Sequence, residues 1–259
     1  MKYMRELYQF RDLLWLWTMR EVMVRYKQSL LGIAWAILQP LALTAVFTVV
    51  FARLVRVDTG GIPYPVFAYT ALVPWTLLAT AITFGIPSLV NNMNLVTKIY
   101  FPREILPLAS IGAALLDFAI AAVIFVGMML FYGVWPSLYT LWVIPLLAIQ
   151  IILMVGVTLL GATVIVFFRD MRFVVPLVTQ VWMYASPIVY PAELVPLRLQ
   201  PIYYLNPMAG LIDGYRRALL TAQPPQLNFV LIAAVISILI LLISYALFKH
   251  VERDFADLI

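Results

Sequence analysis

The sequence predicts an all-α integral membrane protein with six transmembrane helices. Of its 259 residues, 64% are hydrophobic and only 11% are charged, whereas soluble domains average about 45–50% apolar and about 25% charged residues. The apolar residues also stand in long runs without Asp, Glu, Lys or Arg. A helix of about 20 such residues crosses a hydrocarbon core about 30 Å thick. Lipid is therefore the expected solvent for most of the chain.

The positions of these runs define the six expected spans. The longest run, residues 118–168, exceeds one span and is divided at residues 132–137, where Gly and Pro break helices and aromatic residues favour the membrane interface. A transmembrane domain, 31–259, then follows an N-terminal segment, 1–30. Its spans are expected at about 31–54, 64–88, 105–131, 139–167, 174–191 and 228–248.

The distribution of basic residues predicts the orientation. Six crossings put both termini on one side. Of the 17 Lys and Arg residues, twelve lie at the termini and in the loops 91–104 and 169–173, and five lie on the opposite side. Because cytoplasmic segments carry the excess of Lys and Arg, both termini are expected in the cytoplasm.

Two segments outside the spans have helical patterns of their own. Apolar and aromatic residues recur at helical spacing over 4–27, with charged residues on another face, which predicts a cytoplasmic amphipathic helix in the membrane surface. Prolines in 192–227 exclude one continuous helix, but Asn206 and Pro207 are a favourable start for a short one. We expect short, partly re-entrant helices there, on the outer side before the last span.

Asp117 is the only ionisable residue deep within an expected span. Charged groups at that depth are costly, so an intramembrane charge is a functional hypothesis by default. The alternative is a structural carboxyl, hydrogen-bonded to a neighbouring helix through a face of small residues. Proton coupling is disfavoured, because a relay needs a second intramembrane ionisable group and the spans offer none.

Several kinds of chemistry are excluded by composition. There is no Cys and one His, so neither a thiol site nor a His cluster for a metal is expected. No phosphate-binding Gly-rich loop ending in Lys is present, and no hydrolase motif stands out. The net charge of +5 is not concentrated in a basic, aromatic-rich soluble patch, so no nucleic-acid partner is expected. The chain is therefore expected to be no enzyme, to bind no cofactor, and to take any power for transport from another chain.

The cytoplasmic loop 91–104 is the best candidate for a partner contact. Its asparagines favour a helix start and Phe101-Pro102 a helix end, and a helix this short is marginal in water unless it packs against something. It could instead lie on the membrane face. The candidate contact residues of this loop are Asn92, Asn94, Leu95, Val96, Lys98, Ile99, Phe101, Pro102 and Arg103. A second charged turn on the same side adds Arg169 and Asp170.

Aromatic residues are abundant in the first, second and fifth expected spans. Most should pack in the core or at the interface, but aromatic faces also suit sugar rings and other flat or cationic groups. The candidates for a translocation path are Trp35, Phe47, Phe51, Tyr69, Trp75, Trp182 and Tyr184.

Four segments together carry a family resemblance: RYKQSLLGIAWAILQPL from Arg25, FPREILPL from Phe101, FRDMR from Phe168 and NPMAGLIDGYRRALL from Asn206. In this order they resemble the permeases of ATP-binding-cassette polysaccharide exporters, which export O-antigen, capsule or teichoic-acid polymers on lipid carriers. The resemblance runs the whole length of the chain. It does not indicate which polymer is carried.

The resemblance implies a homodimer in a bacterial inner (plasma) membrane, joined to two ATPase subunits that hold ATP and Mg. Loop 91–104 would be the main coupling helix, with Arg169-Asp170 as a second contact. The pore would lie between the protomers, and residues 192–221 would close the exit. The implied outer-gate residues are Asn206, Pro207, Tyr215 and Arg216.

Two other functions remain open. One is an exporter permease of similar build for small amphiphiles, which would need only an apolar pocket. The other is a secondary transporter or channel that works without an ATPase, for which Asp117 is the only support.

Overall fold

The computed structural model describes residues 8–27, 29–252 and 255, which form helices joined by short connections, with no strand among them. The α-helices are α2 (Arg11–Tyr26), α3 (Trp35–Phe47), α4 (Tyr64–Gly85), α5 (Ser88–Asn91), α6 (Met93–Lys98), α7 (Ile105–Phe131), α8 (Val143–Phe167), α9 (Met171–Tyr184), α10 (Gln200–Tyr203), α11 (Pro207–Leu220) and α12 (Leu227–Val251). The 3-10 helices are η1 (Gly32–Ala34), η3 (Leu138–Trp142) and η4 (Ala192–Leu194), and η2 (Thr48–Leu54) is a π-helix.

Five helical segments of the described chain are long and apolar enough to cross a membrane. They correspond to the first, second, third, fourth and sixth expected spans, and α7 begins and ends where the sequence predicted. The all-helical fold is therefore confirmed for the described residues, and these five segments are candidate spans. The segments are α3 with η2 (Trp35–Leu54), α4, α7, η3 with α8 (Leu138–Phe167) and α12.

The fifth expected span, 174–191, was wrong at its outer end. Helix α9 stops at Tyr184 and has 14 residues, or about 21 Å at about 1.5 Å per residue. The chain turns after it because the side chains of Asn206 and Arg216 bind carbonyl groups of the following segment, including Ala185 O at 3.3 Å and Ile188 O at 2.7 Å. A sixth crossing by α9 therefore stays a prediction.

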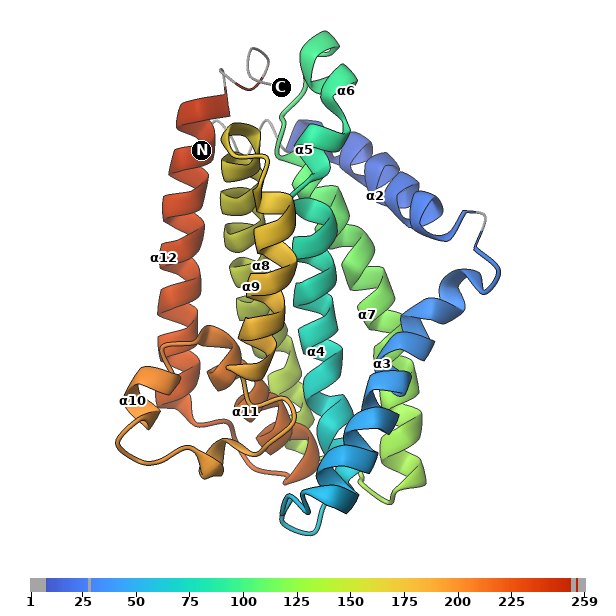
Figure 1. Cartoon of the computed structure of the whole chain (residues 1–259), viewed down its shortest axis with the longest axis vertical. Coiled ribbons are helices and arrows are strands. Elements are labelled where there is room, and N and C mark those ends of the chain that lie inside the picture. Colours follow the sequence, from blue (N-terminus) through green and yellow to red (C-terminus); the bar gives the residue numbers. More distant parts are fainter. Residues whose placement is uncertain (1–7, 28, 253–254, 256–259) are drawn as a thin grey trace.

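The two ends of the bundle carry different elements (Figure 1). Helices α5 and α6, the α8–α9 turn and the last turn of α12 lie at one end, and α10 and α11 lie at the other. This separation matches the division into a loop side and an outer side expected from the sequence. After the roles that the sequence predicts for them, we call the two ends the coupling end and the outer end.

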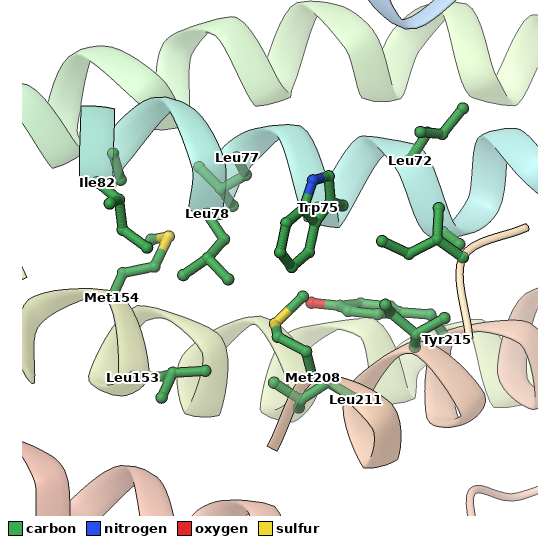
Figure 2. Close-up of a cluster of buried hydrophobic side chains, with 14 of the residues drawn as sticks. Leu72, Trp75, Leu77, Leu78, Ile82, Leu153, Met154, Met208, Leu211 and Tyr215 are labelled. Carbon is green, nitrogen blue, oxygen red and sulfur yellow. The ribbon is translucent and has the colours of Figure 1, made fainter. Parts of the chain in front are cut away.

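Helix α4 lies at the centre of the bundle, between α7 and α3 on one side and α8 and α9 on the other (Figure 1). In its most apolar 18-residue stretch, 78% is buried inside the protein, against 17–39% in the corresponding stretches of the other four long segments. Figure 2 shows Trp75 and Leu78 of α4 facing Met154 of α8 and Tyr215 of α11. Between helices in lipid such contacts stabilise by close van der Waals packing, and this cluster therefore holds α11 against α4 and α8.

The N-terminal helix predicted over 4–27 is observed as α2, and residues 1–7 lie outside the described residues. It packs along α7, where Thr18 is buried and a Cβ on Gly112 would fall 2.8 Å from its hydroxyl oxygen. Trp15 and Met23 are more than half exposed, so an apolar part of α2 is left uncovered. Its position in a membrane surface remains a prediction.

Candidate functional site

Asp117 of α7 is bound by two side chains from the end of α2. Arg25 Nη1 donates to Asp117 Oδ2 at 2.9 Å, and Tyr26 Oη donates to Asp117 Oδ1 at 2.7 Å. Arg25 Nη2 also donates to the carbonyl of Ser110 at 3.2 Å. The side chains of Arg25 and Asp117 are 7% and 18% exposed, so the ion pair is largely shielded from solvent. This geometry fits the structural interpretation of Asp117, with a partner that comes from outside the spans.

A cavity of about 280 Å³ lies beside this ion pair, between α2, α3, α4 and α7. Asp117, Arg25 and Tyr26 line it together with an amide, hydroxyl groups and aromatic rings. Trp35 is the only residue of the predicted translocation path that lines this cavity. The other lining residues with polar or aromatic side chains are Gln39, Thr76, Thr80, Phe84 and Phe118.

The other predicted path residues have different surroundings. Phe47, Tyr69 and Trp75 are packed in the protomer interior, with exposed fractions of 8%, 0% and 3%. Phe51 and Trp182 are half-buried, and only Trp35 and Tyr184 are exposed, each by about half. A path along the protomer surface could therefore contact the last two directly, while the buried three support the helices behind it.

Loop 91–104 comprises the end of α5, the short helix α6 and a non-helical connection to α7. Helix α6 runs from Met93 to Lys98, but no side chain caps its start: the amide of Asn92 donates instead to Ser88 O at 2.8 Å, and its oxygen accepts from Arg20 at 3.2 Å. The expectation that these asparagines cap the helix was therefore wrong for Asn92. The oxygen of Asn92, the atom that would accept from a backbone N–H as a cap, instead accepts from Arg20.

The predicted contact residues of this loop differ in how far they are buried. Val96, Phe101 and Pro102 are buried, and the first two belong to an apolar cluster with Phe248 of α12 and residues of α7 and α8. Leu95 and Arg103 are partly buried, whereas Asn94, Lys98 and Ile99 are exposed at the coupling end. Only the exposed group can offer its side chains fully to another protein.

The end of this loop is tied to α12 by charged groups. Lys249 forms ion pairs with Glu104 and, at 2.8 Å, with Glu252. The Glu104 side chain is only 3% exposed. The Arg103 side chain also donates to the carbonyl of Glu252. We call Arg103, Glu104, Lys249 and Glu252 the loop anchor.

Arg169 and Asp170 lie in the turn between α8 and α9, at the coupling end (Figure 1). Both residues are exposed. The carbonyl of Arg169 accepts from Arg172 Nε at 3.2 Å, which holds the turn. The structure thus brings this second charged turn to the same end as α6.

The predicted outer-gate residues hold the segment after α9 in place. Asn206 caps α11 by accepting from Met208 N at 3.1 Å, as expected, and also accepts from Trp182 Nε1 at 2.8 Å. Arg216 is buried, donates to Ile188 O and to Tyr190 O at 2.7 and 3.1 Å, and lies 3.6 Å over the ring of Phe67.

Helix α11 is buried far more completely than an amphipathic outer helix would be. Every residue from Pro207 to Arg216 is buried, Pro207 included. Tyr215 Oη donates to Gln150 Oε1 at 3.0 Å inside the bundle. Burial also raises the pKa of the Asp213 carboxyl to about 6 and lowers the pKa of the Arg216 guanidinium to about 9. Helix α11 is therefore wedged among α4, α8 and α12.

Sequence reasoning missed Arg25 as the partner of Asp117, and Lys249 and Glu252 as partners of the loop. Arg25 and Asp117 are 92 positions apart, and the helical spacing that reveals local pairs does not apply at that distance. A weak signal existed: Arg25-Tyr26 opens one of the four segments that carry the family resemblance.

A central buried helix among long apolar helices, with polar clusters at both ends, defines a multi-pass α-helical membrane protein. Comparison with known proteins gives its family: residues 12–220 match the model of the ABC-2 type transporter membrane family, and the chain belongs to that family.

Similar curated proteins cover nearly the full chain. An O-antigen export system permease protein RfbA of Klebsiella pneumoniae is 32% identical, with 96% of this chain and 95% of the relative aligned. An O-antigen export system permease protein RfbA of Myxococcus xanthus is 27% identical, over 98% and 97% of the two chains. The polysialic acid transport protein KpsM of Escherichia coli is 24% identical, over 91% and 92%.

Proposed function

We propose that this chain is the permease subunit of an ATP-driven exporter of a lipid-linked polysaccharide. The observation that carries the proposal is the end-to-end similarity to permeases named for O-antigen export, one of them 32% identical over 96% of this chain. The similarity to a polysialic acid transport protein supports a polysaccharide in general and leaves the polymer open.

The energy would come from two copies of a separate ATPase subunit. The sequence holds no phosphate-binding loop of the Gly-rich type, so ATP and Mg would bind to the partner and not to this chain. Helix α6 would be the main docking element, with Ile99 and Lys98 exposed for contact and Arg169-Asp170 as a second contact. ATP can bias the permease only if the two conformations of the partner fit it differently.

The loop anchor gives this docking a mechanical consequence. Val96 and Phe101 seat the loop in the apolar cluster at the coupling end, and the loop anchor ties its last residues to α12. A push on α6 would therefore move α7 and α12 together, because packed interiors shift as units rather than deform freely.

Two copies of the chain would enclose the pore. Helix α9 has no buried residue, and its exposed side chains include Leu177, Val181 and Tyr184. The exposed face of α3 includes Trp35 and Leu38. Exposed apolar faces mark lipid or protein contact, and aromatic rings there suit a passing sugar chain. Residues 192–221 would close the outer exit, with Asn206, Pro207, Tyr215 and Arg216 as gate residues.

The orientation follows from the same assignment. The chain would lie in a bacterial inner (plasma) membrane with both termini in the cytoplasm, since the coupling end must meet a cytoplasmic ATPase. The excess of Lys and Arg expected on that side supports this orientation.

Reconstitution of the permease with and without its ATPase tests the proposal. The expected result is transfer of lipid-linked polysaccharide into proteoliposomes that depends on both chains and on ATP. Transfer by the permease alone under an ion gradient would favour a secondary transporter or channel. ATP-dependent transport of small amphiphiles without any polysaccharide transfer would favour the other exporter class.

A further inference from the structure

The cavity beside Asp117 has polar groups that the fold does not fully use. The Arg25 side chain is only 7% exposed, and its Nε is buried without a hydrogen-bond partner among the described residues. A buried donor left unsatisfied is costly, so this atom would gain from an acceptor that comes within reach. Arg25 is one of the residues that line the cavity, so an acceptor inside it could take this donor.

The balance of charge in the cavity favours a neutral ligand. The guanidinium of Arg25 is already neutralised by Asp117 at 2.9 Å, and these two are the only charged side chains among the lining residues. A phosphate group would gain the free Nε but would lie close to the Asp117 carboxylate, and like charges in a shielded site repel strongly. Hydroxyl groups meet no such penalty, and they can donate to the remaining lone pairs of Asp117.

The rest of the lining suits a ring with one apolar face and a hydroxyl-bearing edge. The rings of Trp35 and Phe118 supply aromatic surface, and Gln39, Thr76 and Thr80 supply an amide and two hydroxyls. The volume of about 280 Å³ is close to the lower limit of roughly 300 Å³ for small-molecule sites. This is space for one sugar ring but not for a polymer chain.

We propose that the cavity between α2, α3, α4 and α7 binds one neutral sugar residue of the exported glycan. The inference rests on the proposed polysaccharide export and names a sugar-binding site within each protomer. Arg25 Nε donates to a hydroxyl oxygen of the sugar, the Thr80 hydroxyl donates to the ring oxygen, Asp117 and Gln39 accept from hydroxyl groups, and the Trp35 ring covers the apolar face. Because Arg25 and Tyr26 end α2, an occupied cavity also fixes that helix against α7.

Equilibrium binding to the full-length permease in lipid nanodiscs tests the site. The probes are the methyl glycosides of glucose, galactose, mannose and N-acetylglucosamine, with sodium phosphate as the anion, and the signal is tryptophan fluorescence. At least one glycoside should bind saturably, and phosphate should neither bind nor compete. Gln39→Leu and Thr80→Val should each weaken binding about 2- to 10-fold, as expected for one lost hydrogen bond. Trp35→Leu should abolish the fluorescence change.

Matched controls separate the cavity from general effects. Trp135→Leu and Gln226→Leu change the same residue types at exposed outer positions and should leave binding unchanged. Each variant is first checked for folding by its elution in gel filtration. The comparison needs two cavity variants that pass this check. The proposal is overturned if no glycoside binds saturably, if cavity variants bind like the wild type, or if phosphate binds in place of the glycosides.

An export assay distinguishes failure of this inference from failure of the proposed function. If the wild type and its ATPase transfer no polysaccharide, the function itself is wrong. If the wild type exports while the cavity variants export equally well and glycosides do not bind, only the sugar site is wrong.

Discussion

The loop anchor permits a quantitative test. The substitution Glu104→Gln removes the negative charge of the buried Glu104 side chain and leaves its size nearly unchanged. Glu104 is 3% exposed and Lys249 is 14% exposed, and Lys249 keeps Glu252 at 2.8 Å after the change. Loss of one partner from a buried ion pair costs about 3–5 kcal/mol. Because one carboxylate remains, we expect the lower value, about 3 kcal/mol. For a chain of this size that is a fall in melting temperature of about 6–12 °C.

The assay is thermal unfolding of the detergent-solubilised permease, followed by the fraction that remains monodisperse. Asp12→Asn is the matched control, because Asp12 forms an exposed pair with Arg11 at 3.8 Å and its side chain is 91% exposed. Its melting temperature should change by no more than about 2 °C, since surface changes stay within about 0.5 kcal/mol. If Glu104→Gln shifts the melting temperature no more than Asp12→Asn, the loop anchor does not stabilise the fold as argued.

Three further predictions concern other parts of the molecule. Ile99→Asp should abolish both co-purification with the ATPase and ATP-dependent export, because Ile99 is exposed on the docking loop. Membrane insertion should stay normal. Normal export by this variant would reject the docking role. Arg25→Met should destabilise the protein by about 3–5 kcal/mol, because it leaves the shielded Asp117 carboxylate without its cation. Adding Asp117→Leu should recover most of that loss, since the buried charge is then gone as well. Equal melting temperatures for the single and double variants would contradict this. Burial raises the pKa of Asp213 from 3.8 to about 6. The folded protein should therefore lose up to about 3 kcal/mol of stability as pH rises from about 4 to 6. Asp213→Asn should remove this dependence of the melting temperature on pH, and an unchanged dependence would assign it to another group.

The sign of the Asp213 effect follows from proton binding. Between pH 4 and 6 the folded protein holds a proton on this carboxyl that the unfolded chain has already released. The folded state is therefore favoured at the acidic end of this window, and the contribution is lost as pH rises through the folded pKa. An ion-paired surface Asp would give the opposite slope.

Most of the span boundaries could be predicted because they depend on local composition. Span 105–131 was placed correctly because α7 begins directly after the Arg103-Glu104 charges and ends directly before a Tyr-Gly break. The outer end of α9 could not be placed in this way. Residues 185–191 carry no charge, and neither do residues 173–184 before them, whereas in the structure the side chains of Asn206 and Arg216 bind carbonyls of residues 185–191.

The candidate site residues divide along the same line. Loop 91–104 stood out as a short polar interruption between apolar runs, but the burial of Val96 and Phe101 and the exposure of Ile99 depend on what α7, α8 and α12 cover. Asp117 stood out as an intramembrane charge, whereas its partner did not. The cavity beside it is formed by four helices from three separate parts of the chain, so no single stretch of sequence contains its pattern.

The sequence by itself determined that this is a helical membrane protein, where its long spans lie, and which family it resembles. It could do so because placing a charge in hydrocarbon is costly at each residue separately. Spans therefore appear in the sequence as runs without charged residues. The tertiary structure alone decided that Arg25 meets Asp117, that Lys249 meets Glu104, and that α11 lies buried in the bundle. These contacts depend on how distant helices pack, and packing is a property of the assembled bundle that no local stretch of residues specifies.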